Sequence, residues 1–415
     1  APCSGYPTLK SYGSADGIIP DSSQNKFEQL LLRAGNQSDV LKLVSNYASL
    51  GTYILHGDSD RVVSVNYARQ MKKVLSTFHP DFSYYEYPSG EHWFGNQSVD
   101  WKPLFDYFKW HVRLEDSAVN QIDFTTASPG ISSVNRWASV LQQIHPLQYS
   151  RIQLNRDRRS KKITGTTKNC KVLKFDLSQF DNNTTVHISL DNTTPVLYTT
   201  SSSIDSVVLE WKEGNWAISK VPNFNQKGPH RYGTFKDGFR NNMVFVYGTI
   251  GTAQENEWSL NKAKYDAETW YYRGNGSIDI ISDKQFSIEK YKDRGVILFG
   301  NHTTNAAWNI LLSDCPIQVD RNKIMVGNKL WTGDDLGAYF VWPIAGSPIA
   351  SVSVIAGSGI KGMKAAMANQ YFAGASGFPD FMIFSLDMLH AGADGIKMAG
   401  FFDNDWKISS EELVQ

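Results

Sequence analysis

The sequence predicts a multidomain chain of the α/β plus β class, made of three units. An α/β unit is expected over residues 1–117, a β-sandwich over residues 118–226, and an open, Rossmann-like α/β sheet domain over residues 227–415. Three observations support this prediction. The chain has 415 residues, too many for one small domain. Strand and helix patterns alternate in its first and last parts, and short Thr/Val/Ile-rich runs fill the middle.

Composition excludes several classes of function. The chain carries 41 basic and 41 acidic side chains, so it has no net charge that would attract nucleic acid or an anionic membrane surface. No apolar run approaches the roughly 20 residues that a membrane span requires. The 3 cysteines form no C-x-x-C pair, so neither a disulfide framework nor a structural zinc site is expected.

The first unit has the pattern of a parallel strand-helix-strand crossover. Leucines around a Gly-Asn break predict two short helices over residues 26–45. An apolar run at 53–55 predicts a buried strand that ends at a polar turn, and helical spacing follows over 65–78. The aromatic run 82–87 predicts the second strand, and 104–112 a closing helix. Short joints between these elements favour parallel pairing of the two strands.

The middle unit consists of short strands separated by turn residues. Runs at 172–175, 186–190, 196–199 and 207–211 alternate with clusters of Asn, Asp, Gly and Ser. This spacing is typical of an antiparallel sandwich. Gly and Pro in residues 227–240 predict a linker to the last unit.

The last unit returns to alternating strands and helices, which predicts an open sheet with helices on its faces. The expected strands are residues 243–247, 278–281, 296–299, 351–355 and 381–384, and the expected helices are 255–271 and 304–312.

Two polar turns of the first unit hold the clearest chemical signal. Asp60 lies in the turn that begins His56-Gly57 after the first strand, and His92 lies in the turn after the second. Loops that leave the carboxyl ends of neighbouring parallel strands meet over one edge of the sheet, so these two side chains are expected to touch. A carboxylate beside an imidazole is the acid–base half of a nucleophilic triad.

These motifs resemble the α/β-hydrolase superfamily, and most closely the prolyl-oligopeptidase-like serine peptidases. That family has an H-G-x-x-D-x-x-V strand end and a G-x-H turn near its carboxyl terminus. The resemblance implies that Asp60 is the triad aspartate and His92 the triad histidine. Gly57 matches the glycine of the strand end, and Trp93 the aromatic residue that often follows the histidine. The implied activity is hydrolysis of a peptide or ester bond through an acyl-enzyme.

The family's nucleophile elbow, G-x-S-x-G, is missing from the chain. Residues 374–378 read Gly-Ala-Ser-Gly-Phe, which fails at the last position and follows Asp60 and His92 instead of preceding them. Residues 1 to about 115 also supply two strands of a sheet that normally has about eight. We therefore expect this segment to be the carboxyl-terminal half of a hydrolase domain. Its serine and its amino-terminal half would come from polypeptide upstream, and this chain alone would be inactive.

The sequence therefore predicts a serine hydrolase, most closely a prolyl-oligopeptidase-like peptidase, with a peptide or ester substrate. No metal or organic cofactor is expected, because a triad and its oxyanion hole supply the chemistry. A carbohydrate or acyl esterase on the same fold is one alternative, and a non-catalytic binding or structural fragment is another. By analogy with multidomain hydrolases, a periplasmic or secreted location is expected.

Structural interpretations accompany these chemical ones. Asp58 and Asp60 could cap the helix that begins near residue 65, and His56 is expected to make structural hydrogen bonds. The G-x-G-x-x-G at 357–362 could bind a nucleotide, but it is interpreted as a tight strand-to-helix turn because the acidic residue of that fingerprint is missing. The basic residues of 151–162 have no aromatic neighbours and predict a solvated face.

Overall fold

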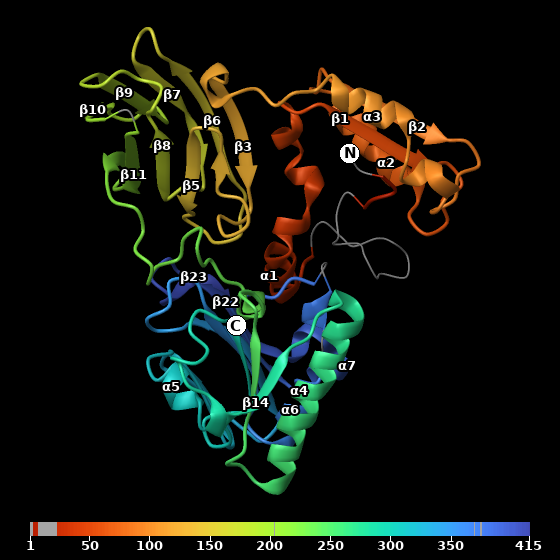
Figure 1. Cartoon of the computed structure of the whole chain (residues 1–415). Coiled ribbons are helices and arrows are strands. Elements are labelled where there is room, and N and C mark those ends of the chain that lie inside the picture. Colours follow the sequence, from red (N-terminus) through yellow and green to blue (C-terminus); the bar gives the residue numbers. More distant parts are fainter. Residues whose placement is uncertain (1–2, 7–22, 203, 369, 374–375) are drawn as a thin grey trace.

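The computed structural model describes residues 3–6, 23–202, 204–368, 370–373 and 376–415 (Figure 1). The described strands form separate sheets: a two-stranded sheet, two five-stranded sheets, an eight-stranded sheet and a small three-stranded sheet. The two-stranded sheet lies in the orange part of the chain, the five-stranded pair in the yellow part, and the large sheet at the carboxyl end. This mixed α/β and β architecture agrees with the predicted fold class.

The amino-terminal unit (residues 50–112) is a parallel pair of strands with helices around it. β1 (Thr52–Gly57) pairs in parallel with β2 (Phe82–Tyr87), and α2 (Val65–Leu75) connects them. Ser64 caps α2, so the predicted capping by Asp58 or Asp60 is wrong. The apolar face of α2 packs on Ile54 of β1. The connection after β2 includes η5 (Gly95–Ser98), and α3 (Lys102–Lys109) closes the unit.

The sandwich (residues 121–218) packs two five-stranded sheets face to face. One sheet has the order β10-β9-β7-β6-β3 and the other β12-β11-β8-β5-β4. Inward side chains such as Phe124, Ile152 and Phe175 alternate with exposed ones and form a single core between the sheets. The strands are β3 (Gln121–Thr126), β4 (Val134–Asn135), β5 (Ala138–Gln142), β6 (Ser150–Asp157), β7 (Lys162–Lys168), β8 (Val172–Asp176), β9 (Thr185–Leu190), β10 (Val196–Thr199), β11 (Ser206–Lys212) and β12 (Asn215–Ile218).

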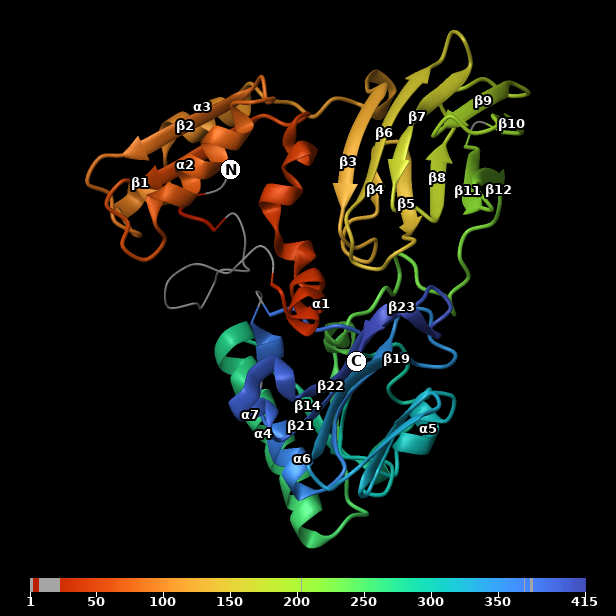
Figure 2. The ribbon, with the colours of Figure 1, turned by 180° about the vertical axis from the view of Figure 1, so that it is seen from behind.

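The segment before β1 connects all three parts of the molecule. α1 (Lys26–Ala34) packs on the carboxyl-terminal sheet (Figure 2). Its Leu30 and Ala34 side chains are buried there. The prediction of a second short helix before residue 45 is wrong. The residues after α1 form the 3₁₀ turns η2 (Asn36–Ser38), η3 (Val40–Lys42) and η4 (Val44–Tyr47) instead. Asn, Ser and Asp side chains in this segment offer the backbone alternatives to a helix. η4 runs beside β3 of the sandwich.

Residues 227–240 were predicted to be a linker, and this is wrong. Lys227, Arg231, Tyr232 and Phe235 are all buried in the terminal unit, and η7 (Phe235–Phe239) packs against its sheet. The buried ammonium of Lys227 is paired with the carboxylate of Asp380. The glycine and proline residues predicted an exposed turn between domains, whereas the buried side chains of this segment make it part of the core of the terminal unit.

The terminal unit (residues 227–415) has an eight-stranded sheet of order β14-β13-β15-β20-β19-β21-β22-β23. The first four strands are parallel, but β19 and the strands beyond it pair antiparallel, so the Rossmann-like expectation holds for half of the sheet. Seven residues, 344–350, join β19 to β20. Such a connection is too short for a parallel crossover.

The strands of the large sheet are β13 (Val244–Tyr247), β14 (Asp279–Ser282), β15 (Val296–Phe299), β19 (Leu336–Pro343), β20 (Ser351–Gly357), β21 (Phe381–Ser385), β22 (Ile396–Phe402) and β23 (Ile408–Val414). The small sheet has β16 (Ile317–Asp320), β17 (Lys323–Val326) and β18 (Lys329–Thr332). The helices are α4 (Ala253–Gly274), α5 (Trp308–Leu312), α6 (Ile360–Ala365) and α7 (Met388–Ala391).

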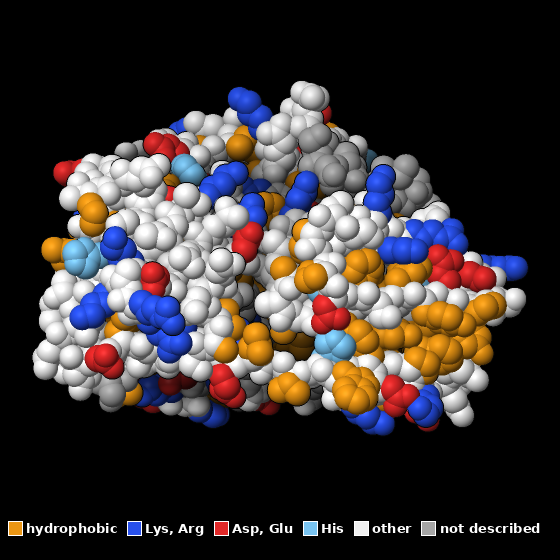
Figure 3. All heavy atoms as spheres, turned by 90° about the horizontal axis from the view of Figure 1, so that it is seen from above, with side chains coloured by type: hydrophobic (Ala, Val, Ile, Leu, Met, Phe, Trp, Pro, Cys, Tyr) orange, Lys and Arg blue, Asp and Glu red, His pale blue; other side chains and the backbone are white. Residues whose placement is uncertain are grey.

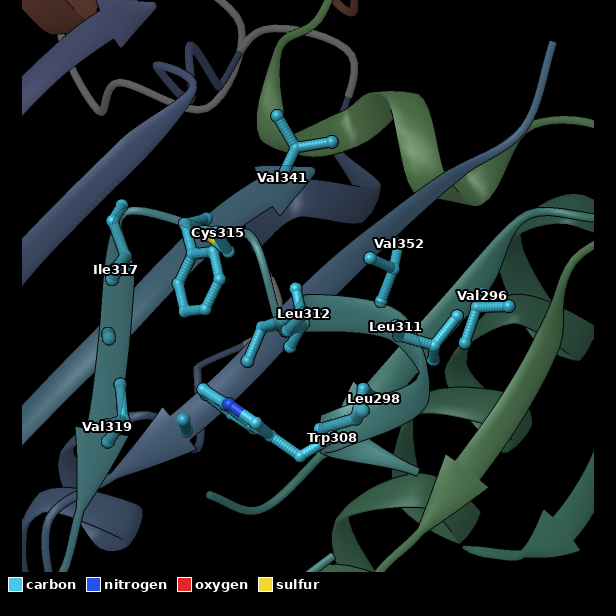
Figure 4. Close-up of a cluster of buried hydrophobic side chains, with 14 of the residues drawn as sticks. Val296, Leu298, Trp308, Leu311, Leu312, Cys315, Ile317, Val319, Val341 and Val352 are labelled. Carbon is cyan, nitrogen blue, oxygen red and sulfur yellow. The ribbon is translucent and has the colours of Figure 1, made fainter. Parts of the chain in front are cut away.

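Alternate residues of the parallel strands serve two cores. Val296 and Leu298 of β15 point to one face, where α5 and the small sheet cover them with Trp308 and other apolar side chains (Figure 4). Ile297 and Phe299 point to the other face, which α1, α4 and α6 cover. Strands that are buried on both faces read as continuous apolar runs, which is why the sequence revealed them.

Candidate active site

The turns after β1 and β2 meet at one edge of their sheet. Because the two strands are parallel and in register, both end at the same level, Gly57 beside Tyr87. The backbone N–H of Asp58 donates to Tyr87 O at 3.1 Å, and the N–H of Ser59 donates to Gly90 O at 2.9 Å. These bonds fasten the turn that contains Asp60 to the turn that contains His92.

Glycine is required where the two turns touch. A Cβ atom on Gly57 would lie 2.3 Å from the carbonyl oxygen of Gly90, far inside van der Waals contact. The facing glycine is also close, because a Cβ on Gly90 would lie 3.0 Å from the Cα of Gly57. A side chain at either position would push the turns apart, and with them the residues that follow.

His92 and Asp60 are joined by a direct hydrogen bond, as the sequence predicted. The distance from His92 Nδ1 to Asp60 Oδ2 is 2.9 Å. The carboxyl group of Asp60 is fully buried, whereas 22% of the His92 side chain is exposed. An ionised carboxylate only accepts hydrogen bonds, so Nδ1 is the nitrogen that carries the proton. The lone pair is then on Nε2.

The other oxygen of Asp60 is held by the backbone. Oδ1 accepts the N–H groups of Val62 and Val63, both at 2.8 Å. Burial opposes ionisation of Asp60, but the hydrogen bonds from Val63, from His92 and from Val62 outweigh it, so the pKa of this carboxyl lies below its usual value. Asp60 is therefore a fixed anion whose orientation is set by its own turn.

His56 is a neighbour of Asp60 that the motif did not reveal. Its Nε2 atom donates to the carbonyl of Val63 at 2.8 Å, which confirms the structural hydrogen-bonding role expected of it. The same nitrogen lies 3.3 Å from Asp60 Oδ2, and the His56 side chain is buried. It also lines a cavity of about 310 Å³ between β1 and α2, together with Ile54 and Met71. The four-residue spacing of His56 and Asp60 across a tight turn could have suggested this contact.

The outer side of His92 is open. Trp93 packs edge-on against the imidazole, with ring centroids 5.2 Å apart, and is itself 76% exposed. Across the described ranges of the chain, Nε2 of His92 has no hydrogen-bond partner. A basic nitrogen that is accessible and held in one tautomer can accept a proton from a group placed beside it.

The remaining sequence signals lie away from this pair. Of the near-miss pentapeptide 374–378, residues 374 and 375 lie outside the described residues, and Gly377 packs against the backbone of α1. The glycines of 357–362 pack a tight turn from β20 into α6, since a Cβ on Gly362 would lie 1.9 Å from Leu336 O. This confirms the interpretation of that motif as a strand-to-helix turn.

The described residues contain no group of three or more His, Cys, Asp or Glu side chains that is arranged to hold a metal ion. None of the helices that the structure describes is long and apolar enough to cross a membrane.

Comparison with known proteins gives one distant relative to report. No protein-family model matches the sequence. An uncharacterized secreted protein of Arthroderma benhamiae is 23% identical to it over 435 aligned positions. The alignment covers the whole of this chain and 44% of that protein, so the chain spans less than half the length of the relative.

Proposed function

We propose that Asp60 and His92 are the acid–base half of a serine hydrolase, most closely a prolyl-oligopeptidase-like peptidase. The observation that supports this proposal is the 2.9 Å bond between His92 Nδ1 and a fully buried Asp60 carboxylate, which leaves Nε2 accessible. His92 therefore has one nitrogen fixed by a carboxylate, and its other nitrogen has no partner among the described residues.

The proposed chemistry follows from the charges of this pair. Nε2 of His92 would take the proton of a serine hydroxyl as that oxygen attacks the carbonyl carbon of a peptide or ester. Asp60 would hold the ring in its tautomer and stabilise the imidazolium that forms. His92 would then return the proton to the leaving amine or alcohol, and water would release the acyl group by the same route. This scheme uses no metal or organic cofactor.

The nucleophile in this proposal comes from polypeptide outside the 415 residues. The relative is more than twice as long as the aligned region, which leaves room for such a segment. Within the described residues, the amino-terminal unit has a sheet of two strands, fewer than a stable sheet normally needs. It also exposes apolar side chains that further protein could cover, including Phe105 and Phe108 of α3. By analogy with the relative, we propose that the protein is secreted.

The test is labelling of the whole encoded protein with a fluorophosphonate, which reacts with activated serines. The wild type is expected to be labelled and His92→Ala to lose labelling. Asp60→Asn should reduce it strongly, since an unoriented imidazole is a poor base. The matched control is His187→Ala, which removes an exposed histidine of β9 that makes no contact with the pair.

Two results would contradict the proposal. Labelling that persists in His92→Ala would remove this histidine from the mechanism. A wild-type protein that is folded but never labelled would favour a binding or structural role instead. If labelling does depend on His92, a panel of peptides and acetylated sugars would then separate a peptidase from an esterase.

A further inference from the structure

A groove separates the sandwich from the segment that precedes β1. Two connected depressions form it, one of about 510 Å³ and one of about 780 Å³, and both are lined by Ser49, Val119, Gln121 and Asn155. Seen from above, the surface is hollowed between the sandwich and the amino-terminal unit (Figure 3). We call this the edge groove. Its larger depression lies within the size range of ligand sites in proteins, and so does the smaller.

One wall of the edge groove is formed by β3, β6 and β7 of one sheet, and it ends at the open edge of β3. Among the strands that the structure describes, β3 is the last of its sheet and pairs with β6 alone. The N–H of Arg156 donates to Asn120 O at 2.8 Å, which marks residues 120 and 156 as a hydrogen-bonded pair. In an antiparallel ladder such pairs alternate with non-bonded ones. The N–H and C=O groups of residues 121, 123 and 125 therefore point away from β6, to the open edge.

One of these three outward positions is already occupied by a side chain that imitates a strand. Asn46, in η4, donates from Nδ2 to Thr125 O and accepts the Thr125 N–H at Oδ1, both at 2.8 Å. This pair of bonds is the one that a backbone residue of a neighbouring strand would make. In the described part of the chain, no group pairs with the outward N–H and C=O of Gln121 and Asp123.

We propose that the edge groove binds an extended polypeptide, which adds to β3 as a further strand beyond Asn46. Main-chain bonds to Gln121 and Asp123 would supply the pairing, as in other cases of strand addition to an exposed sheet edge. Exposed strand edges are otherwise usually blocked in native proteins. Here the edge at Gln121 and Asp123 lies in a groove between the sandwich and residues 45–49.

The lining residues indicate which polypeptide fits. The amide side chains of Gln121, Asn135 and Asn155 have no partner among the described residues, and each can donate and accept hydrogen bonds. Arg158 and Arg159 line the larger depression beside Asp157, which interacts electrostatically with Arg159, and within the same described ranges neither guanidinium group makes an ion pair at contact distance. None of the described residues that line either depression is aromatic, so they offer no stacking platform for a sugar ring. Two arginines against one aspartate favour a strand that carries acidic side chains as the ligand.

This site is separate from the proposed active site. Ser49, at the groove, precedes β1, whereas Asp60 and His92 follow the opposite ends of β1 and β2. Six residues of strand place about 20 Å between the two ends of β1. The inference does not rest on hydrolysis, and its test measures binding alone.

The experiment uses the 415-residue chain and a fluorescein-labelled octapeptide of alternating valine and glutamate. Fluorescence anisotropy gives the dissociation constant. Gln121→Pro removes the outward N–H without touching the ladder to β6, since proline is tolerated at strand edges. Gln121→Ala keeps that N–H and is the matched control. Ile218→Pro places the same change at an outward position of β12, a different edge of the same sandwich.

Both substitutions at residue 121 remove the Gln121 amide, so strand addition predicts that Gln121→Pro binds about fivefold to tenfold more weakly than Gln121→Ala, the loss of one main-chain hydrogen bond. Ile218→Pro should bind within about twofold of the wild type. The peptide methylated at alternate backbone nitrogens should not bind, because it cannot donate to the edge. Hydrogen exchange provides a readout without mutation: the amides of residues 121 and 123 should be slowed by the peptide.

Three results would overturn the inference. One is the lack of binding at 1 mM peptide, because main-chain recognition tolerates sequence. Another is equal binding of the methylated peptide. The last is binding that leaves exchange at residues 121 and 123 unchanged, since the peptide would then lie elsewhere on the protein.

Discussion

Replacement of Gly57 by alanine tests whether the contact between Asp60 and His92 depends on the close approach of their two turns. In the wild type, the position that the new Cβ would occupy is 2.3 Å from Gly90 O, and ordinary contact begins at about 3.4 Å. The turns must therefore separate by about 1.1 Å. A shift of that size along the His92 direction would stretch the 2.9 Å bond to Asp60 to about 4 Å, beyond hydrogen-bonding distance.

Two measurements check this expectation. Proton NMR should show the downfield Nδ1–H resonance of His92 in the wild type and its loss in Gly57→Ala. Urea unfolding should show a loss of about 1–3 kcal/mol, the usual cost of forcing extra volume into a packed site. The matched control is Gly5→Ala, because a Cβ at Gly5 meets nothing within 4 Å.

The reasoning would be refuted by a Gly57→Ala protein that keeps both the His92 resonance and the wild-type unfolding free energy. Such a result would mean that the turns yield at no cost and that the glycine does not position the pair. An equal loss in Gly5→Ala would show instead that any added methyl group near this sheet is destabilising.

Three further predictions concern charge and burial. Asp60→Asn should lower the unfolding free energy by about 1–3 kcal/mol at pH 7. Because the folded pKa of Asp60 lies below its usual value of 3.8, this difference from the wild type should persist above about pH 5 and shrink as the pH falls through the folded pKa. Urea unfolding of both proteins from pH 7 to pH 3 measures the difference. Lys227→Met leaves the buried carboxylate of Asp380 without its cation and should cost about 3–5 kcal/mol, and the double variant with Asp380→Leu should recover most of this. Iodoacetamide at pH 8 should modify exposed Cys3 in the native protein, whereas Cys170, whose pKa is raised to about 12 by burial, should react only after unfolding, as peptide mass spectrometry would show.

Much of the fold was predictable because it depends on local patterns. The apolar run at 296–299 and the aromatic run at 82–87 predicted strands with the observed bounds. The antiparallel half of the terminal sheet was not predicted, and its strands β19, β22 and β23 were missed. The direction of each strand and its neighbours in the sheet depend on which strand edges remain open after the first strands have paired. The local sequence pattern of a strand contains no information about those edges.

The candidate site divides in the same way. The spacing of Asp60 and His92 after successive strands was enough to predict their contact. The contact of His56 with Asp60 was not predicted, nor was the role of Asn46, which pairs with Thr125 from 79 residues away in the chain. Both contacts depend on tertiary packing: the first on the conformation of the turn after β1, and the second on the position of η4 beside β3.

By itself, the sequence determined the class of the elements and the chemistry of the catalytic candidates, because side-chain type, period and turn residues act over a few neighbouring residues. Tertiary structure alone decided which linker became core, which sheet edge stayed open, and which of the imidazole nitrogens faces solvent. Those outcomes depend on burial and on hydrogen-bond partners from distant parts of the chain, and each is settled only when all competing surfaces have packed together.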